Sequence, residues 1–544
     1  MSDNSPNVIA SKREKLKALL KKREAESRLK APIEKLTKEQ HAMHGNPLSF
    51  FQQSLWMVTE IEHGSHYAYQ IAEAYRLRGE LNREWLIKSL TNICHRHDVL
   101  RTTIHLNSHG AIENRIDLSG HFELTEYSLA QLGITSEQLP QWLSSQTEKP
   151  FDLAKDRLLR VTLIHEQNHQ SVLLLEMHHL ISDAWSIDIL LEELADNYNA
   201  LANGYLPDIQ TLPIQYQDFA IWQKKYLQDG YQDQLINYWK QQLSGIPDVH
   251  RLPLDYPRPK QKSYQGKHIL RHIPQSISMP LRHYVQQQNA SMFMGLYAVF
   301  SSLLSLFSTE EDIVIGSTYA NRQHPDTQQL IGYFVNTLVL RTQVSDDIDF
   351  ESLLARCREV SLEAFEHAQL PFDSLVEALN PQRSLSFNPL FQIMLSYTGD
   401  SGSGEFQMGN ITVESIQTQD NSAQFDISLD ISEDKDGLHC SWEFASDLFT
   451  ANTIEKMADY FERLLEIAID QPQMPLRKLS LLTNEERHTQ LNSFSGPART
   501  YPGAPTLHQR FEAIAERLPT HCAVVHNDQQ MDYQTLDRRS NQVA

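Results

Sequence analysis

The stretch Met177 to Ser186 gathers side chains that can move or hold a proton. It contains His178, His179 and Asp183. The ordinary pKa of histidine suits proton transfer near neutral pH, and a neighbouring carboxylate can orient it or pair with a cation. A general base with a supporting carboxylate is one interpretation, and a satisfied pair of core histidines is another. A metal site is a third, but no further ligand stands at the usual zinc spacing.

The segments on either side must hold this stretch in place. Val172 to Leu175 is a short apolar run that favours a strand. From Ile187 onward the apolar residues recur at helical spacing, which predicts a helix. The histidines thus occupy a turn between two elements, where a scaffold commonly places reactive groups. Adjacent residues leaving a strand point to opposite faces, so we expect one histidine to face a cleft and the other to pack behind it.

With Asp183, the paired histidines resemble the HHxxxDG motif of the condensation domains of nonribosomal peptide synthetases. Other stretches resemble the remaining motifs of that family, in the family's order, over roughly residues 45 to 485. They are Leu48–Trp56, Arg96–Thr102, Tyr216–Trp222, Ile331–Thr337, His367–Phe372 and Arg383–Leu390. A lone HHxxxD would be weak evidence, whereas an ordered set of motifs is specific.

Some positions depart from the family's usual pattern. Ala184 stands where glycine is usual, Ser54 stands where the first motif usually has arginine, and the seventh motif lacks its usual aspartate. Alanine keeps the backbone N–H group but disfavours a positive φ. We therefore expect Ala184 to impair activity only if the turn needs a left-handed backbone there.

The resemblance implies a mixed α/β fold with two lobes similar to chloramphenicol acetyltransferase, arranged in a V around a central tunnel. Donor and acceptor carrier proteins would approach opposite ends of that tunnel. Each would present its substrate on a phosphopantetheine arm, and no cofactor would be bound directly. The acceptor's amine would attack the donor's thioester to form an amide. The donor is an acyl or peptidyl group in elongation, or a fatty acyl group if this is a starter domain.

The resemblance and the chemistry together imply roles for the motif residues. His179 would accept or position the proton that the amine loses, and His178 would pack behind it. Asp183 would shape the turn as a buried ion partner. Its expected mate is Arg322, because the stretch Gly316–Arg322 resembles a family segment that ends in Asn-Arg. A buried carboxylate without such a partner would be costly.

Further residues would support this site. A backbone N–H group near Ala184 or Trp185 would donate to the oxyanion of the tetrahedral intermediate. Asn336 would line the tunnel, with a structural role as its alternative. We interpret Arg96 and Arg101 as structural, since buried arginines commonly pair with carboxylates.

Composition and the pattern of expected helices and strands divide the chain into parts. The 544 residues are 40% hydrophobic, which allows a large packed core, and the net charge of −21 argues against general nucleic-acid binding. We expect a leader at 1–44, an N-lobe at 45–225, a C-lobe at 226–485, a polar linker at 486–505, and a segment resembling the truncated start of an adenylation domain at 506–544. Scattered cysteines and a polar first segment without a signal peptide predict a cytoplasmic protein.

Two segments carry separate expectations. Residues 11–30 are basic and helix-prone, and would form either a solvated leader helix or a contact to an upstream synthetase subunit or carrier. The uncharged run from Ser291 to Ser308 is about as long as a membrane span, but its serines favour a buried helix.

The segment after residue 505 also implies a downstream adenylation domain as a partner.

Other protein classes share parts of this pattern. A coenzyme A-dependent acyltransferase shares HHxxxD, but the adenylation-like tail argues against it. An epimerization domain would follow a carrier, whereas this domain precedes a segment that resembles an adenylation domain. A cyclization domain would have aspartates in place of both histidines, so it is disfavoured as well. A non-catalytic docking scaffold stays open because of Ala184. Turnover with loaded carriers would separate the scaffold from an enzyme.

Overall fold

The computed structural model describes residues 32–61, 69–120, 122–146, 149–166, 169–227, 230–400, 406–416, 422–494, 496 and 506–543. The chain divides into a compact unit that ends at Leu479 and a small unit that begins at Ser480. The basic segment at 11–30 lies outside the described residues, so its expected role stays a prediction.

The first sheet of the large unit has six strands, in the order β11-β12-β1-β6-β5-β4. Neighbouring strands are antiparallel except for β4 and β5, which are parallel. The strands are β1 (Gln70–Arg78), β4 (Thr125–Ser128), β5 (Leu159–His165), β6 (Gln170–His178), β11 (Phe406–Met408) and β12 (Ile411–Ile416). A separate hairpin joins β2 (Thr102–Leu106) to β3 (Ile112–Ile116).

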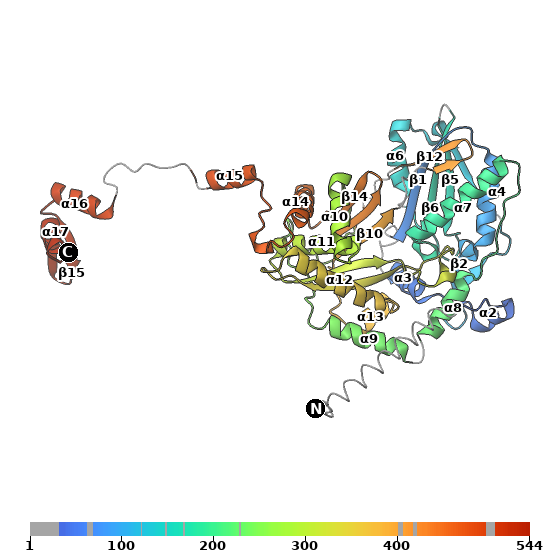
Figure 1. Cartoon of the computed structure of the whole chain (residues 1–544), viewed down its shortest axis with the longest axis horizontal. Coiled ribbons are helices and arrows are strands. Elements are labelled where there is room, and N and C mark those ends of the chain that lie inside the picture. The colour runs from blue at the N-terminus through green and yellow to red at the C-terminus, as the bar shows by residue number, and fades with distance from the viewer. Residues whose placement is uncertain are drawn as a thin grey trace, which may run out of the picture. The chain divides into compact units, whose positions relative to one another are not determined.

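Strand β6 is buried on both faces, which explains its continuous apolar run. Leu173 and Leu175 belong to a core cluster shared with α4 (Arg83–Arg96) and α7 (Ala184–Ala202), while Val172 and Leu174 belong to a cluster on the other face, shared with α6 (Leu139–Gln146). Figure 1 shows α4 and α7 alongside this sheet. The other helices of this half are α2 (Lys38–His44), α3 (Phe50–Ile61), α5 (Leu129–Leu132) and α8 (Tyr216–Tyr226). The end of β6 is therefore a firmly held platform.

The second sheet also has six strands, in the order β7-β14-β13-β10-β8-β9. Strand β10 runs parallel to both of its neighbours, and the other pairs are antiparallel. The strands are β7 (Gly266–Pro274), β8 (Asp312–Tyr319), β9 (Asn336–Gln343), β10 (Ile393–Asp400), β13 (Ile427–Asp434) and β14 (Gly437–Ala445). Two sheets combined with helices confirm the expected mixed α/β class.

Helices pack against the apolar side of the second sheet. They are α10 (Gln275–Gln287), α11 (Met292–Ser308), α12 (Phe350–Glu366) and α14 (Ala451–Asp470). In the same half, α13 (Phe372–Leu379) packs against α9 (Tyr231–Gln242) and β9. Helix α11 is buried along most of its length, as its uncharged sequence predicts. Among the described residues no single helix is long and apolar enough to cross a membrane, although the bent pair α10 and α11 passes the same test of length and composition.

The division of the large unit at residues 225 and 226 misplaces one segment. Strands β11 and β12 fall within the predicted C-lobe, but they extend the first sheet through the pairing of β12 with β1. Their alternating pattern indicates a strand but carries no information about which sheet the strand joins. The chain therefore crosses from the second sheet to the first and back again.

The expected end segments also differ from the structure. The described part of the predicted leader packs onto the large unit, since Ile33 is buried in the first core cluster. The Leu36 N–H group also donates to Asp218, at 3.0 Å. Helix α15 (Asn484–Ser493) occupies the start of the predicted linker. Beyond it, the small unit contains α16 (Leu507–Arg517), the hairpin of β15 (Cys522–His526) and β16 (Gln529–Asp532), and α17 (Tyr533–Val543).

Gly316 in β8 offers a test of the packing in the second sheet. A Cβ atom there would lie 2.1 Å from a ring carbon of Phe391, which is itself buried. Gly316→Ala should lower the free energy of unfolding by about 1–3 kcal/mol through overpacking, measured by urea denaturation. Gly399→Ala in β10 is the matched control, because nothing lies within 4 Å of its added Cβ. Equal stability of the two variants would contradict this packing.

Candidate active site

The turn that follows β6 is fixed in part by His178. Its ring is buried, and the N–H group of Leu180 donates to its Nδ1 at 3.1 Å. Phe151 packs edge-on against it, with ring centroids 6.2 Å apart. A neutral histidine whose Nδ1 accepts carries its proton on Nε2. His178 thus packs behind the turn and shapes it, as expected for one member of the pair.

His179 begins the short 3₁₀ turn His179–Ile181 and is only half-buried. Its Nδ1 lies 3.3 Å from the backbone oxygen of Ser182. A carbonyl oxygen can only accept, so Nδ1 carries the proton and Nε2 keeps a lone pair. Burial lowers the pKa of His179, against the smaller opposing effects of the Ser182 carbonyl and Asp183. The ring is therefore neutral near pH 7 and able to accept a proton at Nε2.

Asp183 holds the start of α7 and an ion pair at the same time. Its Oδ1 accepts from the Ser186 N–H group at 2.9 Å, and its Oδ2 accepts from the Phe334 N–H group at 3.1 Å. The Arg322 guanidinium lies 3.0 Å from Oδ1, and both side chains are 2% exposed or less. The predicted pair is present, and its carboxylate is occupied on both oxygens. Asp183 is thus a structural anchor for the turn.

Arg322 is held as firmly as its partner. Its guanidinium donates to the backbone oxygens of Thr327 and Leu330, at 2.7 and 2.6 Å. It also lies over the ring of Phe334, 4.1 Å from the centroid. Burial lowers the pKa of Arg322, and Asp183 opposes that effect. The guanidinium ties the loop after β8 to the start of α7, and so joins the two halves of the large unit.

Ala184 is the first residue of α7, and its backbone is helical. The turn therefore needs no left-handed residue at this position. Alanine in place of glycine causes no backbone strain here, so we expect no loss of activity from it. Trp185 is exposed, and its indole N–H group donates to the Gln328 oxygen at 3.1 Å. The first N–H groups of a helix are not used by the helix's own hydrogen bonds. The expected oxyanion donor near Ala184 or Trp185 stays a prediction.

Asn336 has a structural role, which was the alternative to lining a tunnel. Its amide nitrogen donates to the backbone oxygens of Ala368 and Leu370, at 2.8 and 2.7 Å. Its oxygen accepts from the Phe372 N–H group at 3.1 Å. With these bonds made, the buried amide ties β9 to the chain that enters α13. These bonds favour the structural role, and the expectation that Asn336 lines a tunnel stays a prediction.

Arg96 and Arg101 are held by protein groups, in agreement with their structural interpretation. Arg96 pairs with Glu193 and donates to the Gln210 oxygen at 3.0 Å. Arg101 pairs with Asp98 and donates to the Cys94 oxygen at 2.7 Å. These bonds fasten the end of α4 to its surroundings.

Several residues of the site had no role assigned from the sequence. The Ser186 hydroxyl lies 2.7 Å from Asp183 Oδ1 and accepts from Arg322 at 2.8 Å. The Tyr216 hydroxyl lies 2.9 Å from Ser49 Oγ and donates to the Tyr333 oxygen. Ser49, Tyr216 and Ser186 all lie in the motifs quoted above. Their place in these motifs was the only sign in the sequence that they belong to the site. Their contacts could not be predicted, because they depend on the fold.

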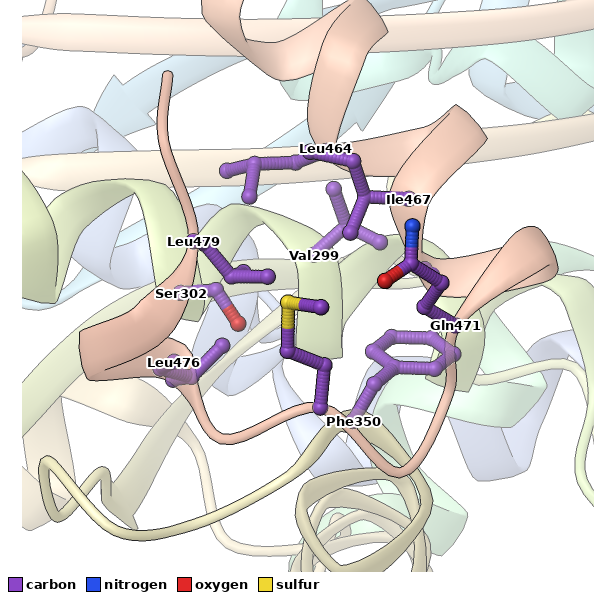
Figure 2. Close-up of a pocket in the computed structure, with 10 residues that line it drawn as sticks. Val299, Ser302, Phe350, Leu464, Ile467, Gln471, Leu476 and Leu479 are labelled. Carbon is purple, nitrogen blue, oxygen red and sulfur yellow. The ribbon is translucent and has the colours of Figure 1, made fainter.

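The described cavities lie away from this turn. The one in Figure 2 is mostly apolar, is lined by residues such as Val299, Phe350 and Leu464, and has a volume of about 10 Å³. That is about the least space a single water needs. A second, of about 20 Å³, lies near His250 and Phe391. Neither could hold an aminoacyl group, so the candidate site rests on the turn itself.

The buried pair should dominate the stability of the site. Removing either charge alone, as in Asp183→Asn or Arg322→Met, should destabilise the protein by about 3–5 kcal/mol, because a lone charge stays buried. The double variant should lose less than the sum of the single losses. A double-mutant cycle in urea measures this. The exposed pair Arg78–Glu414 is the control, with an expected coupling of about 0.2–1 kcal/mol. Additive losses at Asp183 and Arg322 would contradict the account.

Known proteins resemble this chain over most of its length. A linear gramicidin synthase protein of Brevibacillus parabrevis is 35% identical over 501 residues, which cover 92% of this chain and 6% of that protein. Surfactin synthase subunit 1 of Bacillus subtilis (strain 168) is 33% identical over 520 residues, which cover 95% of this chain and 14% of that protein. The chain therefore spans only a small part of these relatives.

Solved structures share the fold. The X-domain from teicoplanin biosynthesis matches with a TM-score of 0.72 at 27% identity, over 80% of this chain and 97% of that one. A four-domain nonribosomal peptide synthetase bound to AMP and glycine matches with a TM-score of 0.76 over 90% of this chain and 38% of that one, and its 22% identity shows the fold alone. A family model described as "Condensation domain" matches residues 43–491. The chain therefore belongs to the condensation-domain family of the nonribosomal peptide synthetases, whose reaction is the formation of a peptide bond.

Proposed function

We propose that this domain joins a carrier-bound acyl or peptidyl thioester to the amine of a carrier-bound aminoacyl group, with His179 handling the proton. The observation that supports this most is the state of the His179 ring. Its Nδ1 is engaged by the Ser182 oxygen, which leaves Nε2 basic in a half-buried position. The turn that carries it is held by the buried Asp183–Arg322 pair.

The proposed step balances without a bound cofactor. The acceptor's nitrogen attacks the thioester carbon, so a C–N bond forms and the carbonyl oxygen becomes an oxyanion. The nitrogen loses a proton to Nε2 of His179. The C–S bond then breaks, and the donor's phosphopantetheine leaves as a thiol after taking up a proton. The lengthened chain stays on the acceptor carrier.

Electrostatics at the start of α7 support the oxyanion. The positive end of a helix dipole and its free N–H groups favour negative charge, and α7 begins directly after Asp183. Asp183 itself does not serve as the base, because its oxygens already accept hydrogen bonds and pair with Arg322. The roles therefore divide between a basic histidine and a structural carboxylate.

We extend the proposal to the partners. Donor and acceptor carriers would deliver the substrates, and the segment from residue 506 would be the start of an adenylation domain. A second linear gramicidin synthase protein of Brevibacillus parabrevis, 32% identical over 543 residues, supports this because its match continues through that segment. Parallel assays with peptidyl and fatty acyl donors would separate an elongation domain from a starter domain.

Replacing each histidine should give different results. His179→Ala should lower product formation by roughly 10²-fold or more with the fold intact, because it removes a positioned proton acceptor. His178→Ala should instead lower the melting temperature, because this buried ring accepts from Leu180 and packs on Phe151. Intact-mass analysis of the acceptor carrier measures the product. Equal activity of His179→Ala and the parent would remove His179 from the mechanism.

The variant Ala184→Gly distinguishes a catalytic domain from a non-catalytic docking scaffold. Because its backbone is already helical, Ala184→Gly should change the rate by less than about tenfold, which corresponds to roughly 1.4 kcal/mol of barrier. A steady-state assay with both loaded carriers, at equal folded concentration, measures it. If glycine raised turnover by several orders of magnitude, the natural domain would be catalytically impaired, and the scaffold would be the better account.

A further inference from the structure

A short loop before β9, residues 331–334, is held by hydrogen bonds from the first half of the large unit. Three of its N–H groups donate to side chains of that half. They are those of Ile331 to His97 Nδ1 at 3.3 Å, Gly332 to Ser186 Oγ at 3.0 Å and Phe334 to Asp183 Oδ2 at 3.1 Å. Buried N–H groups must find such partners. The backbone of the loop is therefore fixed relative to the first half.

The buried side chain of Tyr216 holds the remaining residue of the loop. Its hydroxyl donates to the Tyr333 oxygen and lies 2.9 Å from Ser49 Oγ. Its ring packs directly on Gly332, where an added Cβ atom would lie 2.0 Å from a ring carbon of Tyr216. The backbone of Tyr333 is thus fixed on both sides, and so is the direction in which its side chain leaves the loop.

The ring of Tyr333 packs beside the proposed base. Its centroid lies 6.1 Å from that of His179, with 58° between the ring planes, which is within the range of an aromatic contact. On α3, Phe51 packs edge-on against Tyr333, with centroids 6.5 Å apart, and Phe51 belongs to the first core cluster. Tyr333 therefore contacts both the core of the first half and the ring of His179.

The hydrogen bond that orients the His179 ring is a weak restraint by itself. Its length, 3.3 Å from Nδ1 to the Ser182 oxygen, exceeds that of most N–H···O bonds. The torsion that turns a histidine ring about its Cβ–Cγ bond also has a broad range of allowed values. A half-buried ring could therefore turn away from Ser182 unless a neighbouring side chain blocks the movement, and Tyr333 is in contact with it.

We propose that Tyr333 is a positioning residue, whose ring holds the His179 imidazole with Nδ1 toward Ser182 and Nε2 free for the acceptor amine. The proposal rests on the proposed function, because it assumes that His179 accepts the proton. Tyr333 acts through the packing of its ring and not through its hydroxyl. Because loop 331–334 is bound by side chains of the first half, the orientation of the base depends on the contact between the two halves.

A general packing role is the competing account. Tyr333 is partly buried against the first core cluster, so its removal would also lower stability. Trp85 of α4 packs against the same cluster and contacts Tyr198, with ring centroids 5.7 Å apart. Tyr198 follows Ala184 by fourteen positions in α7, which is roughly 21 Å along the helix. Trp85→Ala is therefore a matched control, because it removes an aromatic ring from the same core far from His179.

Nuclear magnetic resonance of the full chain with nitrogen-15-labelled histidine reads the His179 ring without any need for turnover. Tyr333→Ala should shift its signals toward a mixture of the two neutral tautomers and raise its pKa toward the ordinary value, because water replaces the ring. Tyr333→Phe should keep the parent's signals, because it keeps the ring. Trp85→Ala should lower the melting temperature and keep them too. An unchanged tautomer and pKa of His179 in folded Tyr333→Ala would overturn the proposal.

A second variant loosens the loop and leaves the Tyr333 ring in place. Tyr216→Phe removes the hydroxyl that donates to the Tyr333 oxygen, so the His179 signals should shift in the same direction by a smaller amount. Tyr198→Phe is its matched control, because that buried hydroxyl also bonds a backbone group, the N–H of Asn82, at 2.8 Å. Identical His179 signals in the two variants would contradict the dependence on the contact between the halves.

Turnover measures the catalytic consequence. Tyr333→Ala should lower kcat by about 10- to 100-fold and change the acceptor's KM by less than about threefold, because a misplaced base slows the chemical step more than it weakens binding. Tyr333→Phe should keep the parent's kcat. A loss of activity in Tyr333→Phe with unchanged His179 signals would overturn the proposal, because the hydroxyl would then act directly. A parent protein that forms no product would contradict the proposed function alone, since the state of the ring is measured separately.

Discussion

The buried pair of Asp183 and Arg322 is the interaction on which the site depends. Neither charge could stay buried alone, so the loop after β8 and the start of α7 must meet at a fixed geometry. The same carboxylate caps α7 and accepts from the Phe334 N–H group, so one group sets the helix, the turn and the contact between the halves. The turn carrying His179 is positioned by these constraints, and its proton chemistry follows from them.

Much of the site could be predicted because its residues are close in sequence. The paired histidines lie between an apolar strand and a helix: His178 ends β6 and is buried, whereas His179 begins the turn and is half-buried. The Asp183–Arg322 contact spans a long stretch of chain and was reached only through the motif resemblance. The mixed α/β class followed from the motif resemblance, and the burial of α11 followed from its uncharged, serine-containing sequence.

What sequence could not supply depended on contacts between distant segments. The role of Asn336 is set by the oxygens of Ala368 and Leu370, which become its partners only when β9 lies against the chain leading to α13. The strands β11 and β12 have an ordinary strand pattern, but only the pairing with β1 shows that they join the first sheet.

The central claim is that the turn presents His179 as a neutral base, with its proton on Nδ1. Nuclear magnetic resonance of the protein with nitrogen-15-labelled histidine tests this most directly, with the His179 signals assigned by their loss in His179→Gln. The account predicts a neutral ring at pH 7, protonated at Nδ1, with a pKa below the ordinary histidine value because burial disfavours the charged form. A ring protonated at Nε2, or one still charged at pH 7, would contradict it.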